Sequence, residues 1–499
     1  MNDRESKRAS SGQSREPVSL LSGTAVLVGG RFVVAALGWA GTLLIVRSLT
    51  PPQWGGFSFV FSLLGVLGVL SDLRVGRLAM AAMMKDPEPG AVVGSYIGLR
   101  FVLGVLSYLV ALAVVVIGGY PHEVVTATAV AGLVLVIAAL SSSLEMAFQA
   151  SMWYSPIAFA DMLGQLAQFL LTVVIAAAWS GTMVSFAVPA VLFEIVAVTL
   201  KYLLLRRRMD IKIRLRYREW LSWLKEAFPL VIGSAMATVY FRIDAIMLSK
   251  MDSLTSVGLY NIGYKFSDLL AIIPIAALGA ALPLLVRSWP GDIARFRQAF
   301  QVSFTLLVVA AVGFTIGFAG VARPVIGLLY GRQYEVAASA ATGLVAGQSL
   351  HFFTDLDFYV LMAAKRNRAY ALAASLGVLV NVGLNLVLIP RFSYGGAAVA
   401  TIFTEIIVLL SLVGPVGRIP GIRPLNWRMV VKVLLAGTIM LGAVLGLREV
   451  APWPVTTVAA AFAYLAALHI LRIEGPGGLI ALVRKSRFEA PLTAPNEQD

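Results

Sequence analysis

The chain has 499 residues, of which 59% are hydrophobic and only 13% charged. Water-soluble domains carry about 25% charged residues, so this composition excludes a soluble enzyme or binding module and indicates a polytopic membrane protein. The net charge of +14 does not indicate a nucleic-acid partner, because the basic residues lie mostly in short loops between apolar runs and not on one soluble face.

The chain has no cysteine, and its three histidines are scattered. Disulfides, thiolate nucleophiles and cysteine-based metal sites are therefore excluded. We expect no catalytic residues, no metal and no cofactor, and hence a protein that is not an enzyme. Residues 1–19 are polar, and the apolar run that follows is too long for a cleavable signal peptide. We expect that run to remain as the first membrane span.

At about 20 apolar residues per crossing, the sequence predicts an all-α integral membrane protein with about 14 transmembrane helices. In chain order the predicted helices cover residues 20–46, 54–71, 92–118, 124–149, 156–178, 183–204, 226–249, 257–286, 299–321, 336–363, 370–389, 394–415, 429–447 and 453–471. An even number of crossings places both termini on the same side of the membrane.

The distribution of basic residues gives an independent prediction of topology, because Lys and Arg collect in cytoplasmic loops. With the amino terminus inside, the inner segments hold 29 Lys and Arg residues, nine of them from Lys201 to Lys225. The outer loops hold only 6. This bias predicts that both termini are cytoplasmic.

The basic segment 206–228 divides the chain into halves. Together with Trp220, Trp223 and Phe228, its charges favour a strap in the headgroup layer of the inner surface; a plain solvated loop is the alternative. The expected organisation is a cytoplasmic tail (1–19), an N-lobe of six helices (20–205), an amphipathic cytoplasmic linker (206–225), a C-lobe of six helices (226–415), two further helices (429–471) and a second cytoplasmic tail (472–499).

An internal repeat supports this division. LVGG (27–30), Arg47 and Gly55 match LVIG (230–233), Lys250 and Gly258 at a constant offset of 203 residues. A chance match between glycine- and valine-rich helices is the alternative. Parallel repeats of this kind are typical of paired helical bundles that transport by alternating access.

Basic residues inside predicted helices are costly and mark an ion or substrate path, and four of them are considered for this role. Arg31 and Arg242 have no acid on the same helix face, and a guanidinium group binds phosphate through two parallel hydrogen bonds. Lys265 can pair with Asp268 one turn later, and Arg100 can extend towards the inner interface. All four are candidate substrate-binding residues.

Acidic residues also lie inside predicted helices. Asp161 begins a polar stripe that either lines a cavity or packs on a neighbouring helix, and His351 shares a helix face with Asp355. A buried carboxylate finds a cation or holds its proton, so structural pairing and ion coupling both remain open. The candidate ion-coupling residues are Asp161, Glu145, Glu194, Asp355 and Glu405.

Three stretches resemble the oligosaccharide flippase family. They are SGTAVLVGGRF through SDLRVGR (22–77), with an R-x-L-x-P-x-x-W-G pattern at Arg47; FPLVIGSAMATVYFRIDAIMLSK through VGLYNIGYKF (228–266); and PVIGLLYGRQY (324–334) followed by NVGLNLVLIPRFSYGGAAVATIFTE (381–405). The resemblance implies a Wzx-type member of the multidrug/oligosaccharidyl-lipid/polysaccharide exporter superfamily, with two MATE-like six-helix lobes and two additional carboxy-terminal helices.

The resemblance also implies a function. Such proteins move oligosaccharides linked to undecaprenyl pyrophosphate from the inner to the outer leaflet of the bacterial cytoplasmic membrane, for O-antigen, lipopolysaccharide, capsule or exopolysaccharide. It implies membrane lipids, a glycan polymerase and glycosyltransferases as partners, and it places cleft-facing cations at Arg31, Arg242 and Lys265.

Other functions compete with this one. The buried carboxylates suit a cation-coupled drug antiporter of the same superfamily. A membrane glycan polymerase should have a large outer loop with paired acids, and every predicted outer loop is short. A flippase for peptidoglycan precursors or a teichoic-type carrier would share the mechanism, and the sequence does not separate it from an oligosaccharide flippase.

Overall fold

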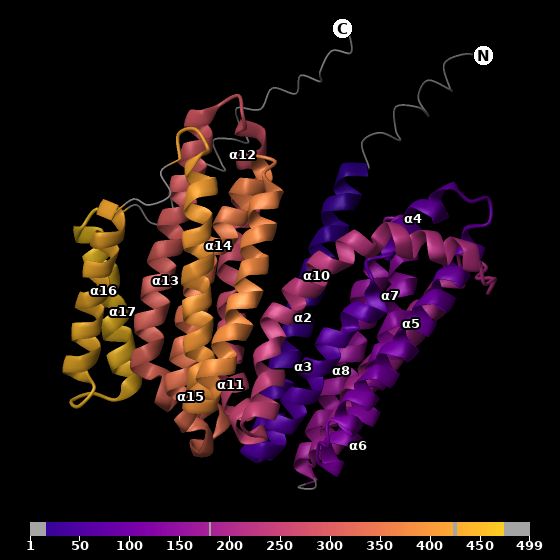
Figure 1. Cartoon of the computed structure of the whole chain (residues 1–499), viewed down its shortest axis with the longest axis horizontal. Coiled ribbons are helices and arrows are strands. Elements are labelled where there is room, and N and C mark those ends of the chain that lie inside the picture. Colours follow the sequence, from indigo (N-terminus) through magenta and orange to yellow (C-terminus); the bar gives the residue numbers. More distant parts are fainter. Residues whose placement is uncertain (1–15, 179–180, 423–426, 474–499) are drawn as a thin grey trace. The chain divides into compact units, whose positions relative to one another are not determined.

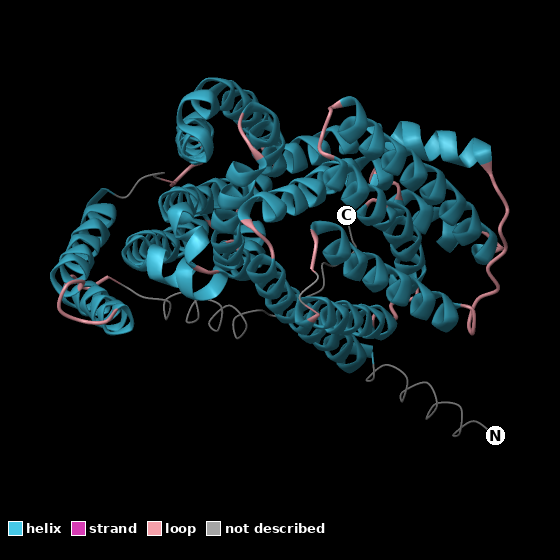
Figure 2. Ribbon diagram, turned by 90° about the horizontal axis from the view of Figure 1, so that it is seen from below, coloured by secondary structure: helices cyan, strands magenta, loops and turns pink. Residues whose placement is uncertain are grey.

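The computed structural model describes residues 16–178, 181–422 and 427–473. Within these residues the chain forms helices and loops, with no strand (Figure 2). The predicted all-helical fold class is confirmed. The chain divides into two compact units, residues 1–246 and 247–499, and the boundary falls within α10 (Tyr217–Met251).

The helices of the first unit before α10 are α2 (Glu16–Ser48), α3 (Pro51–Asp72), α4 (Gly76–Lys85), α5 (Pro89–Ile117), α6 (His122–Ala131), α7 (Leu133–Ala150), α8 (Ser155–Ala177) and α9 (Met183–Leu205). The second unit holds α11 (Leu254–Leu270), α12 (Ile272–Ser288), α13 (Ile293–Tyr330), the short 3₁₀ helix η1 (Arg332–Ala337), α14 (Ala338–Ala363), α15 (Asn367–Gly417), α16 (Trp427–Leu447) and α17 (Trp453–Ile470).

Ten helical segments of the described residues are long and apolar enough to cross a bilayer, so this is a multi-pass membrane protein. The predicted helices 370–389 and 394–415 form the single element α15, with a sharp break at Ser393 (φ 54°). The predicted helix 336–363 corresponds to α14, which is outside the ten and carries His351, Asp355 and Asp357. The count of 14 crossings therefore remains a prediction.

A residue with a hydroxyl group stands at the N-cap of α3 and of α11, the helices in which the two repeat copies end. The backbone N–H of Thr50 donates to Gln53 Oε1 (3.1 Å) at the start of α3, and Ser253 Oγ accepts from the backbone N–H of Ser256 (3.2 Å) at the start of α11. Such contacts satisfy backbone groups that a helix end leaves unpaired. Thr50 and Ser253 are themselves 203 residues apart, so the repeat extends from sequence to local structure.

In the first unit, the segment that precedes α10 packs against a row of glycines on α5. Gly90, Gly94 and Gly98 follow one another at intervals of four residues, which places them on one helix face. A Cβ atom at Gly90 would collide with the carbonyl oxygen of Asp210, and one at Gly94 with that of Lys212. Lys212 N–H also donates to Gly90 O (3.3 Å). The glycines are needed here because the two backbones approach each other so closely.

Ion pairs hold the same segment in place. Arg216 Nη1 lies 2.6 Å from Asp86 Oδ2, and Arg214 Nη1 lies 2.6 Å from Glu88 Oε2. The hydrogen bond from Arg216, together with one from the backbone N–H of Glu88, lowers the pKa of Asp86 below its ordinary value. These ion pairs, together with the glycine row, hold the segment at the beginning of α5.

The indole rings of this region also pack inward. Trp220 and Trp223 are only 8% and 6% exposed, and Trp220 Nε1 donates to Ser95 Oγ on α5 (2.9 Å). The two rings therefore pack on protein, and the placement of the segment in the headgroup layer remains a prediction. Their large apolar faces are covered by protein because the glycine row lets the segment approach α5.

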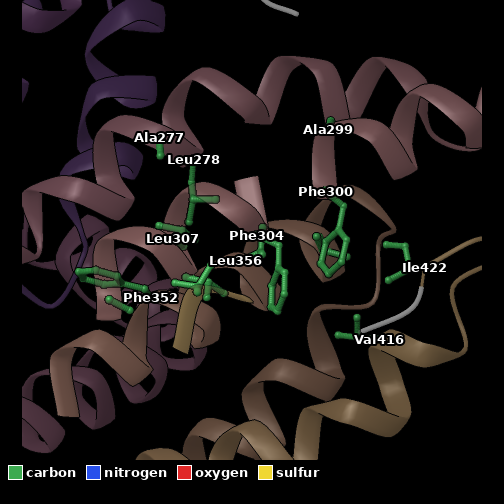
Figure 3. Close-up of a cluster of buried hydrophobic side chains, with 14 of the residues drawn as sticks. Ala277, Leu278, Ala299, Phe300, Phe304, Leu307, Phe352, Leu356, Val416 and Ile422 are labelled. Atoms are coloured by element: carbon green, nitrogen blue, oxygen red, sulfur yellow. The ribbon is translucent and has the colours of Figure 1, made fainter. Parts of the chain in front are cut away.

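The second unit has a core of aliphatic and aromatic side chains. α14 packs against α11, α12, α13 and α15, and Phe304 of α13 lies beside Leu356 of α14 (Figure 3). α16 and α17 pack on each other and on α13 (Figure 1). α14 thus lies inside its unit, where its polar side chains must find partners within the protein.

Candidate functional site

A buried lysine gathers acidic side chains from two other helices of the first unit. Lys201 on α9 is 1% exposed, and its Nζ atom lies 2.5 Å from Glu145 Oε1 on α7 and 2.7 Å from Asp161 Oδ1 on α8. It also donates to Ser141 Oγ (3.0 Å). An ammonium group has three N–H donors, so all three are used. We call Lys201, Glu145, Asp161 and Ser141 the Lys201 centre.

A second cation bonds to the same stretch of α7. Arg100 on α5 is 3% exposed; its Nη1 donates to Asp72 Oδ1 (2.6 Å) and its Nη2 to Ser142 Oγ (2.6 Å). The neighbouring serines Ser141 and Ser142 therefore accept hydrogen bonds from different cations. α7 links the two charged groups because it packs against both α5 and α9.

Two other predicted positions lie close to the Lys201 centre. Glu194 is on α9 seven residues before Lys201, which places both on one helix face, and it experiences the charges of Lys201, Glu145 and Asp161. In the polar stripe of α8, Gln165 is 7% exposed and lies beside Gly38 of α2. This contact supports packing against a neighbouring helix for that part of the stripe.

The second unit contains a centre built around a histidine. His351 Nδ1 lies 3.0 Å from Glu405 Oε1 on α15, and His351 Nε2 lies 3.6 Å from Asp355 Oδ1 one turn along α14. Thr354 Oγ1 donates to the other oxygen of Glu405 (3.1 Å). The expected shared face of His351 and Asp355 is confirmed. We call His351, Asp355, Glu405 and Thr354 the His351 centre.

Both centres hold more carboxylate groups than basic groups. The Lys201 centre has two carboxylates for one ammonium group, with Glu194 nearby, and the His351 centre has two carboxylates for one imidazole. Excess negative charge away from water favours uptake of a proton or a small cation. No group of three or more metal-binding side chains occurs among the residues that the structure describes.

The three remaining predicted cations lie on separate helices. Arg31 is within α2, and its side chain lies outside the described residues. Arg242 on α10 is exposed, two residues before the buried Asp244. Lys265 is half-buried on α11, one turn before Asp268. Their roles in substrate binding remain predictions.

The sequence prediction missed Lys201 as an embedded charge. In the sequence Lys201 groups with the inner-loop cations, because the basic run RRR follows five residues later. The structure instead keeps α9 helical to Leu205 and buries the lysine. The available signal was the seven-residue spacing from Glu194, which puts the two opposite charges on one face of an apolar helix.

Solved structures with the same fold belong to flippases and multidrug transporters. The "Lipid II flippase MurJ, inward closed conformation" aligns with a TM-score of 0.73 at 14% identity, covering 89% of this chain and 98% of that one. An inward-facing multidrug resistance MATE family transporter of the MOP superfamily aligns at 0.63 and 14%, covering 77% and 94%. A MOP superfamily transporter from Pyrococcus furiosus aligns at 0.53 and 14%, covering 80% and 95%. This chain therefore shares the fold of these solved membrane proteins.

A comparison with protein families identifies the family of the chain. The profile described as "Polysaccharide biosynthesis protein" matches residues 44–339. The chain belongs to this polysaccharide biosynthesis protein family, and the suspected relationship to flippases and exporters is confirmed. Among curated proteins, the uncharacterized membrane protein MJ1068 of Methanocaldococcus jannaschii is 21% identical over 213 residues, which is 41% of each chain. The matched region thus spans about two fifths of that relative's length.

Proposed function

We propose that this protein is a flippase that moves oligosaccharides linked to undecaprenyl pyrophosphate from the inner to the outer leaflet of the bacterial cytoplasmic membrane, by alternating access, for surface polysaccharide synthesis. The observation that carries the proposal is membership of a polysaccharide biosynthesis family in a chain whose fold is similar to that of a lipid II flippase. Glycosyltransferases would supply the substrate and a glycan polymerase would consume it. Both termini are cytoplasmic in this proposal, as the charge bias predicts.

The chemistry of this substrate explains why embedded charges are useful. Its pyrophosphate headgroup is anionic and is excluded by hydrocarbon, whereas its polyprenyl tail is retained there. Guanidinium groups inside the membrane offset the cost of bringing the headgroup across. In this proposal Arg31, Arg242 and Lys265 contact the pyrophosphate. Arg100 also remains a candidate, although its guanidinium group already binds Asp72 and Ser142.

We further propose that the Lys201 centre and the His351 centre take up the ion that drives transport. Glu145, Asp161 and Glu194 serve the first unit, and Asp355 and Glu405 the second. The excess of carboxylate over basic groups in both centres supports this role.

Flipping can be measured in proteoliposomes that contain a short oligosaccharide on undecaprenyl pyrophosphate, by its exposure to a membrane-impermeant oxidant. Arg31→Ala and Arg242→Ala should each slow flipping at least about tenfold, the effect of one lost charge-assisted contact. Arg323→Ala, which removes an exposed arginine from α13, is the matched control. Normal rates in both variants would contradict the site assignment and leave the family unchanged.

The second candidate is a cation-coupled antiporter for drugs or other small molecules. The excess of buried carboxylates and the MATE-like fold favour it. Proteoliposomes that expel a fluorescent organic cation but do not flip the lipid-linked oligosaccharide would establish the antiporter and overturn the flippase.

A further inference from the structure

A basic pocket lies at the turn between α14 and α15, where the residues that end α15 also contribute to its lining. It encloses about 390 Å³ and is lined by Lys365, Arg366, Asn367, Arg368, Ala369, Pro415 and Arg418. Four of these residues are basic, all four are exposed, and no acidic residue lines the pocket. We call this site the α15 pocket.

The backbone brings these cations together from the two ends of α15. Lys365 adopts a left-handed conformation (φ 57°) in the turn after α14, and α15 begins two residues later. The break at Ser393 reverses the chain, so that Arg366 Nη1 donates weakly to the carbonyl oxygen of Pro415 (3.4 Å). Val416 and Ile419 are buried on either side of Arg418 and hold it at the pocket.

The positive charge of the pocket is not neutralised by any residue that the structure describes. Within the described part of the chain, no carboxylate forms an ion pair with Lys365, Arg366, Arg368 or Arg418. The basic segment 212–216 of the first unit is the contrast, because its arginines pair with Asp86 and Glu88. Basic residues that only set the orientation of a membrane protein need to lie in cytoplasmic loops and nothing more. That role does not require Arg368 and Arg418 to line the same pocket.

The position of the pocket indicates which kind of anion it binds. The first half of α15, from Asn367 to Ile389, is roughly 34 Å long at 1.5 Å per residue, and the hydrocarbon layer of a membrane is about 30 Å thick. The ends of such a helix reach the level of the lipid headgroups. Basic pockets between helices at this level are suited to phosphate-bearing headgroups.

We propose that the α15 pocket binds the phosphate headgroup of an anionic phospholipid. Arg368, Arg418 and Lys365 contact the phosphate oxygens, while Arg366 also holds the end of α15 through Pro415. The bound lipid fastens the turn after α14 to the end of α15, and this role is separate from the site for the transported substrate.

The test uses the purified full-length protein in detergent, incubated with equal amounts of cardiolipin and phosphatidylcholine. Retained lipids are counted by native mass spectrometry. We expect preferential retention of cardiolipin, and in Arg368→Gln/Arg418→Gln we expect its affinity to fall about fivefold per removed arginine. Arg368→Lys/Arg418→Lys keeps the charge and should retain most of the preference, which separates charge from folding. Arg287→Gln, an exposed arginine at the end of α12, should bind like the wild type.

Three outcomes would overturn the proposal. The first is equal cardiolipin retention in the wild type and in Arg368→Gln/Arg418→Gln. The second is an equal loss in Arg287→Gln, which would indicate a general surface charge effect. The third is release of cardiolipin by excess inorganic phosphate at constant ionic strength, which would identify free phosphate as the occupant.

Discussion

The ammonium group of Lys201 illustrates how one buried side chain connects several helices. It satisfies two carboxylates from different helices and leaves none of its own donors unused. Sequence reasoning identified Glu145 and Asp161 as buried acids that need a cation, yet it had no means of knowing which cation they would find. The cation is Lys201, because helix packing brings α7, α8 and α9 together.

Lys201→Met should destabilise the protein by about 3 kcal/mol, since it leaves two carboxylates without their buried cation. Thermal unfolding in detergent measures the effect. Adding Glu145→Gln and Asp161→Asn to Lys201→Met should recover a large part of the loss, because the uncompensated charges are then removed. An unfolding midpoint equal to that of the wild type in Lys201→Met would refute the proposed pairing.

Asp86 gives a prediction about pH. Its pKa is lowered by Arg216, so the carboxylate stabilises the folded segment 210–216 fully above the ordinary aspartate pKa of about 3.8, and this stabilisation is lost as the pH falls through the depressed value. The 210–216 amides should therefore exchange hydrogen faster in Asp86→Asn than in the wild type at neutral pH. The difference should shrink below about pH 4. A difference that is independent of pH would contradict the ion pair.

At the scale of the elements, hydrophobic run length predicted the positions of the helices well. The predicted ranges at 156–178, 183–204 and 453–471 agree with α8, α9 and α17 to within one residue at each end. The segment before α10 was harder to interpret, because its basic and aromatic residues suit a membrane surface equally well. Its docking depends on three glycines more than a hundred residues earlier, and a local pattern does not contain that contact.

Gly94→Val should displace the segment from α5, because its side chain would occupy the position of the Lys212 carbonyl group. We expect trypsin to cleave at Arg214 and Arg216 at least about tenfold faster, corresponding to about 1.4 kcal/mol of lost local stability. Gly65→Val is the control, since no atom of another residue lies near a Cβ atom at Gly65. Equal cleavage rates in the two variants would show that the glycine row does not hold the segment.

At the scale of the molecule, each compact unit contains its own buried charge centre, and the two units are joined through α10. Alternating access requires that units of this kind change their arrangement during transport while each keeps its internal structure. The absence of cysteine makes this testable, because introduced cysteines are the only thiols present.

Spin labels on cysteines at Met84 and Ile117, both exposed and both in the first unit, should report the same distance with and without substrate. The pair at Val336 and Val450 serves the same purpose in the second unit. Labels at Ile117 and Val336, one in each unit, should report a distance that shifts when substrate is added. Pulsed electron paramagnetic resonance measures all three. An unchanged distance between the units, with transport intact, would exclude alternating access by movement of the two units.

The sequence by itself determined the membrane class, the all-helical fold and the family, because hydrophobic runs and short motifs are local properties of the chain. It also identified most of the buried charged residues, since an ionisable group within an apolar run is visible in one dimension. Only the tertiary structure decided that Lys201 joins Glu145 and Asp161, that His351 joins Glu405, and that segment 210–216 rests on α5. Each of these contacts connects residues far apart along the chain, and helix packing, which periodicity does not encode, brings them together.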